Sequence, residues 1–143
     1  MDPLSITASV IAVATFATNV CLAFSELRAE WTALPGRLHA LNNEVADIKV
    51  VLYQVAAVID ERSCLQNPDG TQADITGLLD NARFNLNELK GIIDNLNGAL
   101  THKNAVLFRA GIWRKQQTKL QTLQDNIKRV KSSLNILLGA SNS

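Results

Sequence analysis

The chain has 143 residues, enough for one domain with a substantial core, and a net charge of +1 at neutral pH. Aromatic residues make up only 5%, whereas leucine, alanine, asparagine and valine are frequent, a composition that favours helices over a β-sandwich. The sequence contains neither a GxxxxGKS/T phosphate loop nor a GxGxxG turn, so we expect no nucleotide site of either kind.

The first element in the chain is a long uncharged helix. Asp2 and Pro3 are typical of a helix N-terminus, and no charged residue occurs in the 23 residues 3–25. Such a helix is about 35 Å long, enough to cross a bilayer, but its Ser, Thr and Asn side chains make it a poor permanent anchor. Apolar residues also recur in it at spacings of four and three, which predicts a core-facing stripe: Ile6, Val10, Val13, Ala17, Val20, Phe24, Leu27, Trp31 and Leu34. We therefore expect a bundle helix that becomes membrane-seeking once it is released.

The context of this segment does not resemble a secretory signal. The first basic residue, Arg28, lies beyond the apolar run, so no positively charged region precedes it. Cys21 and Cys64 are the two cysteines, and their spacing suggests no disulfide framework. The simpler interpretation is that the protein resides in a reducing cytosol.

Three further heptad-like stripes follow, separated by Pro35–Gly36, by the turn-forming residues 67–70 and by residues 101–104. Short connections predict antiparallel neighbours, so the expected fold class is all-α, an antiparallel up-down-up-down four-helix bundle formed by residues 1–140. Leu52, Leu86 and Leu123 should be buried in it. The pattern predicts helices near residues 3–33, 36–62, 74–100 and 104–138, with residues 141–143 as a tail or the start of a linker.

Charge is distributed very unevenly along the chain. Residues 1–100 carry six basic and twelve acidic side chains, a balance of −6, whereas residues 101–143 carry eight basic and one acidic, a balance of +7. Nucleic-acid binding is disfavoured, because Trp113 falls on the apolar stripe and so is not expected to stack on bases. The stronger interpretation of the basic residues in 101–143 is that they form ion pairs with acidic side chains of the other helices. The expected acidic partners are Glu44, Asp47, Asp80, Glu88 and Asp94.

A third interpretation of the basic helix near residues 104–138 is that it is attracted to anionic lipids. The uncharged first helix in the same molecule supports this interpretation. The candidate lipid-binding residues are Lys115, Lys119, Lys128, Arg129 and Lys131.

The sequence carries little that indicates catalysis. His39 and His102 lack a second metal ligand at helical spacing, and Asp60–Glu61 is expected to be a solvated helix end. Cys64 has no histidine base near it in the sequence. A histidine phosphotransfer domain is disfavoured, because the lysine and glycine that such domains place after the histidine are missing beyond His39. We expect no enzyme activity, cofactor or metal.

Three segments carry a family resemblance. The sequence opens with MDPLSITASVIAVATFA, continues with PGRLHALNNEVADIKVVLYQV and closes with RAGIWRKQQTKLQTLQDNIKRVKSSLNILLG. Together they resemble, over nearly the whole chain, the fungal HeLo-like N-terminal domain that precedes NACHT-type NTPase or ankyrin-repeat modules in STAND proteins. One departure is that the family often has Trp-Pro-Phe where this chain has Trp113-Arg114-Lys115.

The resemblance implies a non-enzymatic effector of programmed cell death in fungal immunity and heterokaryon incompatibility. Such a domain is cytoplasmic at rest; when a C-terminal sensor domain or an activating receptor triggers it, it oligomerises with itself and inserts its N-terminal helix into membranes. Its partners would be other copies and membrane lipids, anionic ones above all, and not nucleic acid. The membrane-insertion candidates are Leu4, Ile6, Val10, Ile11, Val13, Phe16, Val20 and Phe24. The alternative is a structural homo-oligomerisation module of a larger receptor, without membrane activity.

Overall fold

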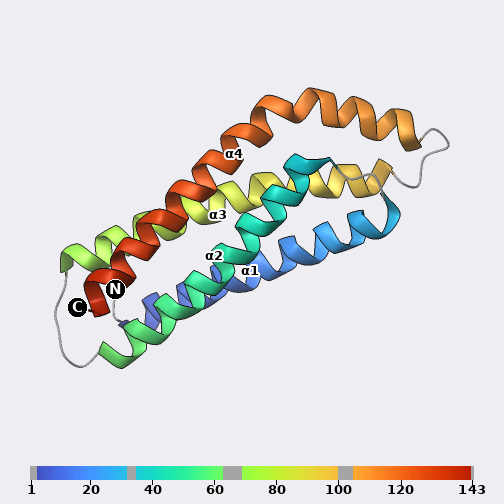
Figure 1. Cartoon of the computed structure of the whole chain (residues 1–143). Coiled ribbons are helices and arrows are strands. Elements are labelled where there is room, and N and C mark those ends of the chain that lie inside the picture. Colours follow the sequence, from blue (N-terminus) through green and yellow to red (C-terminus); the bar gives the residue numbers. More distant parts are fainter. Residues whose placement is uncertain (1–2, 32–34, 63–68, 100–104, 143) are drawn as a thin grey trace.

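A computed structural model describes residues 3–31, 35–62, 69–99 and 105–142. The described chain forms four long helices and no strand: α1 (Pro3–Glu30), α2 (Gly36–Arg62), α3 (Asp69–Gly98) and α4 (Ala105–Asn142). Successive helices run in opposite directions, as Figure 1 shows. The expected all-α four-helix bundle is confirmed.

The helices are not arranged around the bundle in their chain order. α1 packs against α2 and α3, and α4 packs against the same two helices, so α1 and α4 are diagonal partners, as are α2 and α3. Because directions alternate along the chain, the α1–α2 and α3–α4 pairs are antiparallel, whereas the α1–α3 and α2–α4 pairs are parallel (Figure 1). Two of the four interfaces therefore join antiparallel helices and two join parallel helices, within the up-down-up-down order that the sequence predicts. The stripes face a shared axis in either arrangement, so their spacing could not distinguish the two.

The start of α3 and the end of α4 differ from the sequence prediction. α3 begins at Asp69, not near residue 74, and α4 continues to Asn142, past the predicted end near residue 138. Gly139 lies inside α4, and since no described glycine has a positive φ, the left-handed cap typical of a helix end is not formed there. Residues 141 and 142 are helical, not a tail.

The turn between α1 and α2 follows the predicted break closely. α1 ends at Glu30, before the predicted residue 33, and Trp31 N still donates to Leu27 O at 2.8 Å. The carbonyl of Pro35 accepts hydrogen bonds from Leu38 N at 3.0 Å and His39 N at 3.3 Å, which starts α2. The predicted breaks at residues 67–68 and 101–104 lie outside the described residues.

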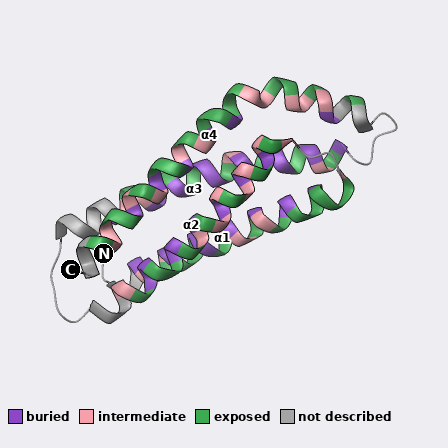
Figure 2. Cartoon of the chain, viewed as in Figure 1, coloured by how far each residue is buried: buried purple, intermediate pink, exposed green. Residues whose placement is uncertain are grey.

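The predicted stripes form one continuous core to which all four helices contribute (Figure 2). Leu52 and Leu86 are fully buried, and Leu123 is 3% exposed, as the spacing predicted. Burial of this apolar surface is the main driving force for folding of the bundle.

One polar side chain, Asn85, lies deep between α3 and α4. Its Nδ2 donates to Asn81 O at 2.8 Å and to Asn81 Oδ1 at 2.6 Å, while its Oδ1 accepts from Asn126 Nδ2 at 3.1 Å. The buried amide therefore has partners for its donor and its acceptor, which removes the cost of desolvating it. The bond to Asn126 also specifies how far along α3 the helix α4 sits.

Replacement of Leu86 by alanine should lower the free energy of unfolding by about 2–5 kcal/mol, because it leaves a cavity in the centre of the core. The matched control is Phe84→Ala on the same helix, since Phe84 is 62% exposed and its loss should change stability by about 0.5 kcal/mol or less. Urea denaturation followed by circular dichroism measures both. Equal effects of the two substitutions would contradict the assigned faces of α3.

Candidate functional site

The candidate membrane-active helix, α1, turns its predicted stripe into the core. Val10, Val20 and Phe24 are fully buried, Ile6 is 2% exposed and Val13 is 4% exposed. The described structure thus sequesters these five membrane-insertion candidates inside the bundle, as the spacing predicted for a soluble form.

The other membrane-insertion candidates do not share that face. Ile11 is 43% exposed and Phe16 is half-buried, while the side chain of Leu4 lies outside the described ones. Thr15 is exposed and Thr18 is half-buried. The candidate set therefore divides between the core and the outer side of the helix.

α1 is unusual among the four helices because its solvent-facing side carries no charged residue before Glu26. It is the most hydrophobic and the least amphipathic of the four. The segment Ile6–Glu30 is long and apolar enough to cross a membrane by length and composition, and only 39% of its most apolar window is buried. A core helix passes the same test, but it is mostly buried, whereas this one presents an uncharged side to solvent.

Polar contacts near its C-terminal end tie α1 to α3 and α4. Asn97 Nδ2 of α3 donates to Ala23 O at 3.2 Å. Just beyond the helix, the guanidinium of the buried Arg109 in α4 lies 4.9 Å from the centre of the Trp31 ring, a cation–π contact. This end of α1 is therefore attached by directional interactions as well as by apolar packing.

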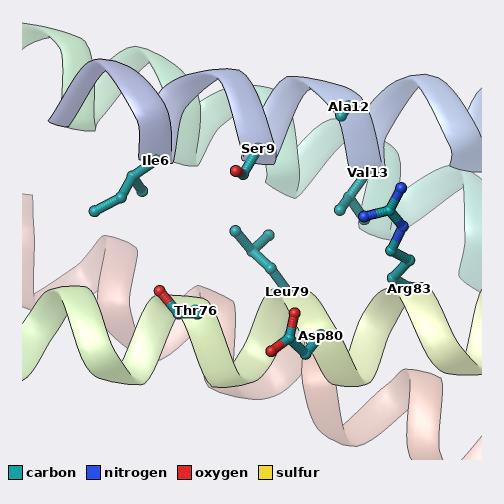
Figure 3. A pocket seen from close by; sticks show the side chains of 8 residues that line it. All are labelled: Ile6, Ser9, Ala12, Val13, Thr76, Leu79, Asp80 and Arg83. Atoms are coloured by element: carbon teal, nitrogen blue, oxygen red, sulfur yellow. The ribbon is translucent and has the colours of Figure 1, made fainter. Parts of the chain in front are cut away.

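The N-terminal half of α1 borders a pocket of about 140 Å³ on the side that faces α3 (Figure 3). Leu79 of α3 points toward α1 between Ile6 and Val13, and the small side chains of Ser9 and Ala12 do not fill the space beside it. Lining atoms in such a gap lose the dispersion contacts that close packing provides. The interface between α1 and α3 is thus imperfectly packed where α1 begins.

The basic residues of α4 do not form a single patch. Lys119 Nζ lies 2.8 Å from Glu88 Oε2 on α3, and Lys131 Nζ lies 2.7 Å from Glu44 Oε2 and 3.4 Å from Asp47 Oδ2 on α2. The hydrogen bond that its ammonium donates to the Glu44 carboxylate raises the pKa of Lys131 above its usual value, although partial burial opposes this. These ion pairs confirm part of the predicted internal compensation of charge.

The remaining lipid-binding candidates, Lys115, Lys128 and Arg129, are exposed, and none forms an ion pair with another residue that the structure describes. Of the other predicted acidic partners, Asp94 pairs with Lys90 of its own helix at 2.8 Å, and Asp80 is exposed. Three cations of α4 are thus available to an external anionic surface.

No described residues form a cluster suited to catalysis or metal binding. The described part of the chain contains no group of three His, Cys, Asp or Glu residues that could hold a metal ion. His39 is exposed, and Trp113 is half-buried against the core. His102 and Cys64, like the side chains of Asp60 and Glu61, lie outside what the structure describes.

By its fold, the chain belongs to the class of all-α four-helix bundles. Comparison with protein-family models, with curated proteins and with solved structures finds no match that would narrow this class to a family.

Cys21 reports on the contact between α1 and α2. Burial raises the pKa of its thiol, and the nearby Lys49 ammonium lowers it by a smaller amount. In the closed bundle the reactive thiolate is therefore scarcer than in the unfolded chain at the same pH.

Alkylation of Cys21 should accordingly be slower at pH 8 in the native protein than in the urea-unfolded protein, and detachment of α1 should accelerate it. The measurement is the rate of iodoacetamide labelling by mass spectrometry in a Cys64→Ser variant, in which Cys21 is the sole thiol. Native labelling should rise toward the unfolded rate as the pH passes the raised pKa. Native and unfolded rates that agree at pH 8 would contradict this placement of Cys21.

Proposed function

We propose that this domain is a non-enzymatic effector of cell-death or immune signalling that self-associates and inserts α1 into a membrane, which it then permeabilises. The observation that carries the proposal is that α1 holds no charge from Pro3 to Ser25 and yet packs only one side into the core. The sequence resemblance to HeLo-like domains supports it. The resting domain would be cytoplasmic and would become membrane-associated on activation by a sensor domain or receptor.

The energetics favour insertion by several copies together. A single α1 in a bilayer would bury its hydroxyl groups without water. Thr18 Oγ1 already donates to Ala14 O at 3.1 Å within the helix, so its cost is small. Other polar side chains, such as Thr15 and Asn19, gain partners when they face neighbouring helices or a water-filled pore.

The exposed cations of α4 supply a first attraction to the membrane. A basic side chain near an anionic leaflet contributes about 1 kcal/mol, and salt weakens the effect. Lys115, Lys128 and Arg129 are available for this contact, whereas Lys119 and Lys131 are engaged by α3 and α2. We therefore assign the lipid-facing charge to the three exposed residues.

The decisive variant places a charge in α1 without disturbing the bundle. Thr15 is exposed and lies near the middle of the uncharged segment, so Thr15→Asp should leave the soluble fold intact. In a bilayer centre an aspartate costs about 2.5–3.5 kcal/mol per helix, so dye release from anionic liposomes by the domain fused to an inducible oligomeriser should fall more than about tenfold.

The matched control is Asn87→Asp, which adds the same charge at an exposed position of α3 and should leave dye release unchanged. Equal release by wild type and Thr15→Asp would show that α1 does not enter the membrane. If oligomerised wild type releases no dye and is harmless in cells, the alternative of a structural interaction module replaces the proposal.

Reversal of Lys128 and Arg129 to glutamate should weaken binding to anionic liposomes more than about tenfold, since each side chain contributes about 1 kcal/mol and reversal adds repulsion. Liposome co-sedimentation at low and high salt measures this. Arg83→Glu with Lys90→Glu makes the same change in net charge on α3 and should have a smaller effect. Equal loss in the two double variants would indicate a response to net charge and not to the surface of α4.

A further inference from the structure

The pocket between the N-terminal half of α1 and α3 has an apolar floor. The floor consists of the buried side chains of Ile6 and Val13 from α1 and Leu79 from α3. The volume of the pocket is about 140 Å³, and a cavity of about 150 Å³ holds one benzene molecule. An apolar group of that size leaves water when it enters and supplies the dispersion contacts that the two helices do not make with each other.

Two hydroxyl groups line the same pocket, one from each helix. Ser9 belongs to α1 and Thr76 to α3, and both residues are half-buried. A hydroxyl oxygen carries two lone pairs, so it can accept a hydrogen bond from a bound molecule even while its own hydrogen is donated elsewhere. The pocket therefore suits a molecule that combines a small apolar body with one hydrogen-bond donor, such as an alcohol.

Charges of both signs stand at the rim of the pocket. Asp80 and Arg83 of α3 line it, and both are exposed. Figure 3 shows the Arg83 side chain extending from α3 toward Val13 of α1. An anion in the pocket would be attracted by Arg83 and repelled by Asp80, and a cation would meet the reverse. A neutral molecule avoids both repulsions, so the rim favours a ligand without net charge.

We infer that this pocket binds a small neutral alcohol, with one ring or branched chain and about eight non-hydrogen atoms, and that the bound molecule holds α1 against α3. The ligand contacts both helices, so it loses one wall of its site when α1 leaves. A ligand that binds only the closed bundle lowers the population of the released form by a factor of one plus the ratio of its concentration to its Kd. This regulatory consequence rests on the proposed function, whereas binding itself is measured without a membrane.

Three probes that share one aromatic ring and differ in charge test the site: benzyl alcohol, benzoate and benzylammonium. Each is titrated into the whole chain, labelled with ¹⁵N, and the amide resonances are followed by two-dimensional NMR. Benzyl alcohol should shift the amides of Ser9, Ala12 and Thr76 in a saturable way and bind at least about threefold more tightly than either ion. Tightest binding of benzoate or benzylammonium would overturn the assignment of a neutral ligand.

Ala12→Leu is the variant that fills the pocket. Ala12 lines the pocket and is exposed, so the larger side chain can occupy the site without entering the core, and benzyl alcohol binding should weaken more than about tenfold. The matched control is Ala57→Leu, the same change at an exposed position of α2, which is diagonal to α3 and should bind like wild type. Circular dichroism verifies that both variants fold. Equal loss of binding in the two variants would contradict the location of the site.

A ligand of this size with ordinary efficiency has a Kd of about 20 mM, so the absence of saturable shifts up to about 50 mM would overturn the inference. Amide hydrogen exchange without lipid tests whether the ligand holds α1. At three times its Kd, benzyl alcohol should slow exchange of residues 14–24, beyond the pocket, about fourfold in wild type and not in Ala12→Leu. Binding without slower exchange would overturn the holding role. Saturable binding in a chain that, once oligomerised, releases no dye would support the site while removing the membrane activity that it regulates.

Discussion

The packing of one side of α1 against α2 and α3 is the constraint on which the rest of the structure depends. α1 contributes fully buried residues such as Val10, Val20 and Phe24 to the core, and without them the facing stripes of α2 and α3 would be open to water. From Pro3 to Ser25 the same helix has no charged side chain on the side that faces solvent. α1 therefore contributes both to the core and to an uncharged part of the surface, and substitutions in its two sides affect different properties.

The sequence was sufficient to predict the helices and their buried faces, because apolar spacing reports directly on which side of a helix avoids water. Leu52, Leu86 and Leu123 are buried for this reason. The order of the helices around the axis could not be predicted, since each stripe fits either neighbour. The predicted start of α3 and the predicted end of α4 were wrong by several residues. Glycine and turn-forming residues permit a helix to stop without requiring it to do so.

The candidate site was predicted less completely than the fold. Opposite charges on different helices suggested internal pairing, and Lys119 with Glu88 and Lys131 with Glu44 form such pairs. Which cations remain exposed depends on the neighbours that each helix acquires, and this is a property of the tertiary arrangement. The cation–π contact of Arg109 with Trp31 was missed because residues so far apart in sequence carry no shared pattern.

The diagonal relation of α1 and α4 has a consequence for the order in which the bundle can come apart. The α2–α4 and α3–α4 interfaces involve no residue of α1, and the bond between Asn85 and Asn126 and the ion pairs of Lys119 and Lys131 all lie within them. Departure of α1 would break its own two interfaces and leave a three-helix remainder organised around α4. The polar contacts that align α4 with α2 and α3 would therefore survive the departure of α1, whereas the apolar faces that α1 covers would be opened to water.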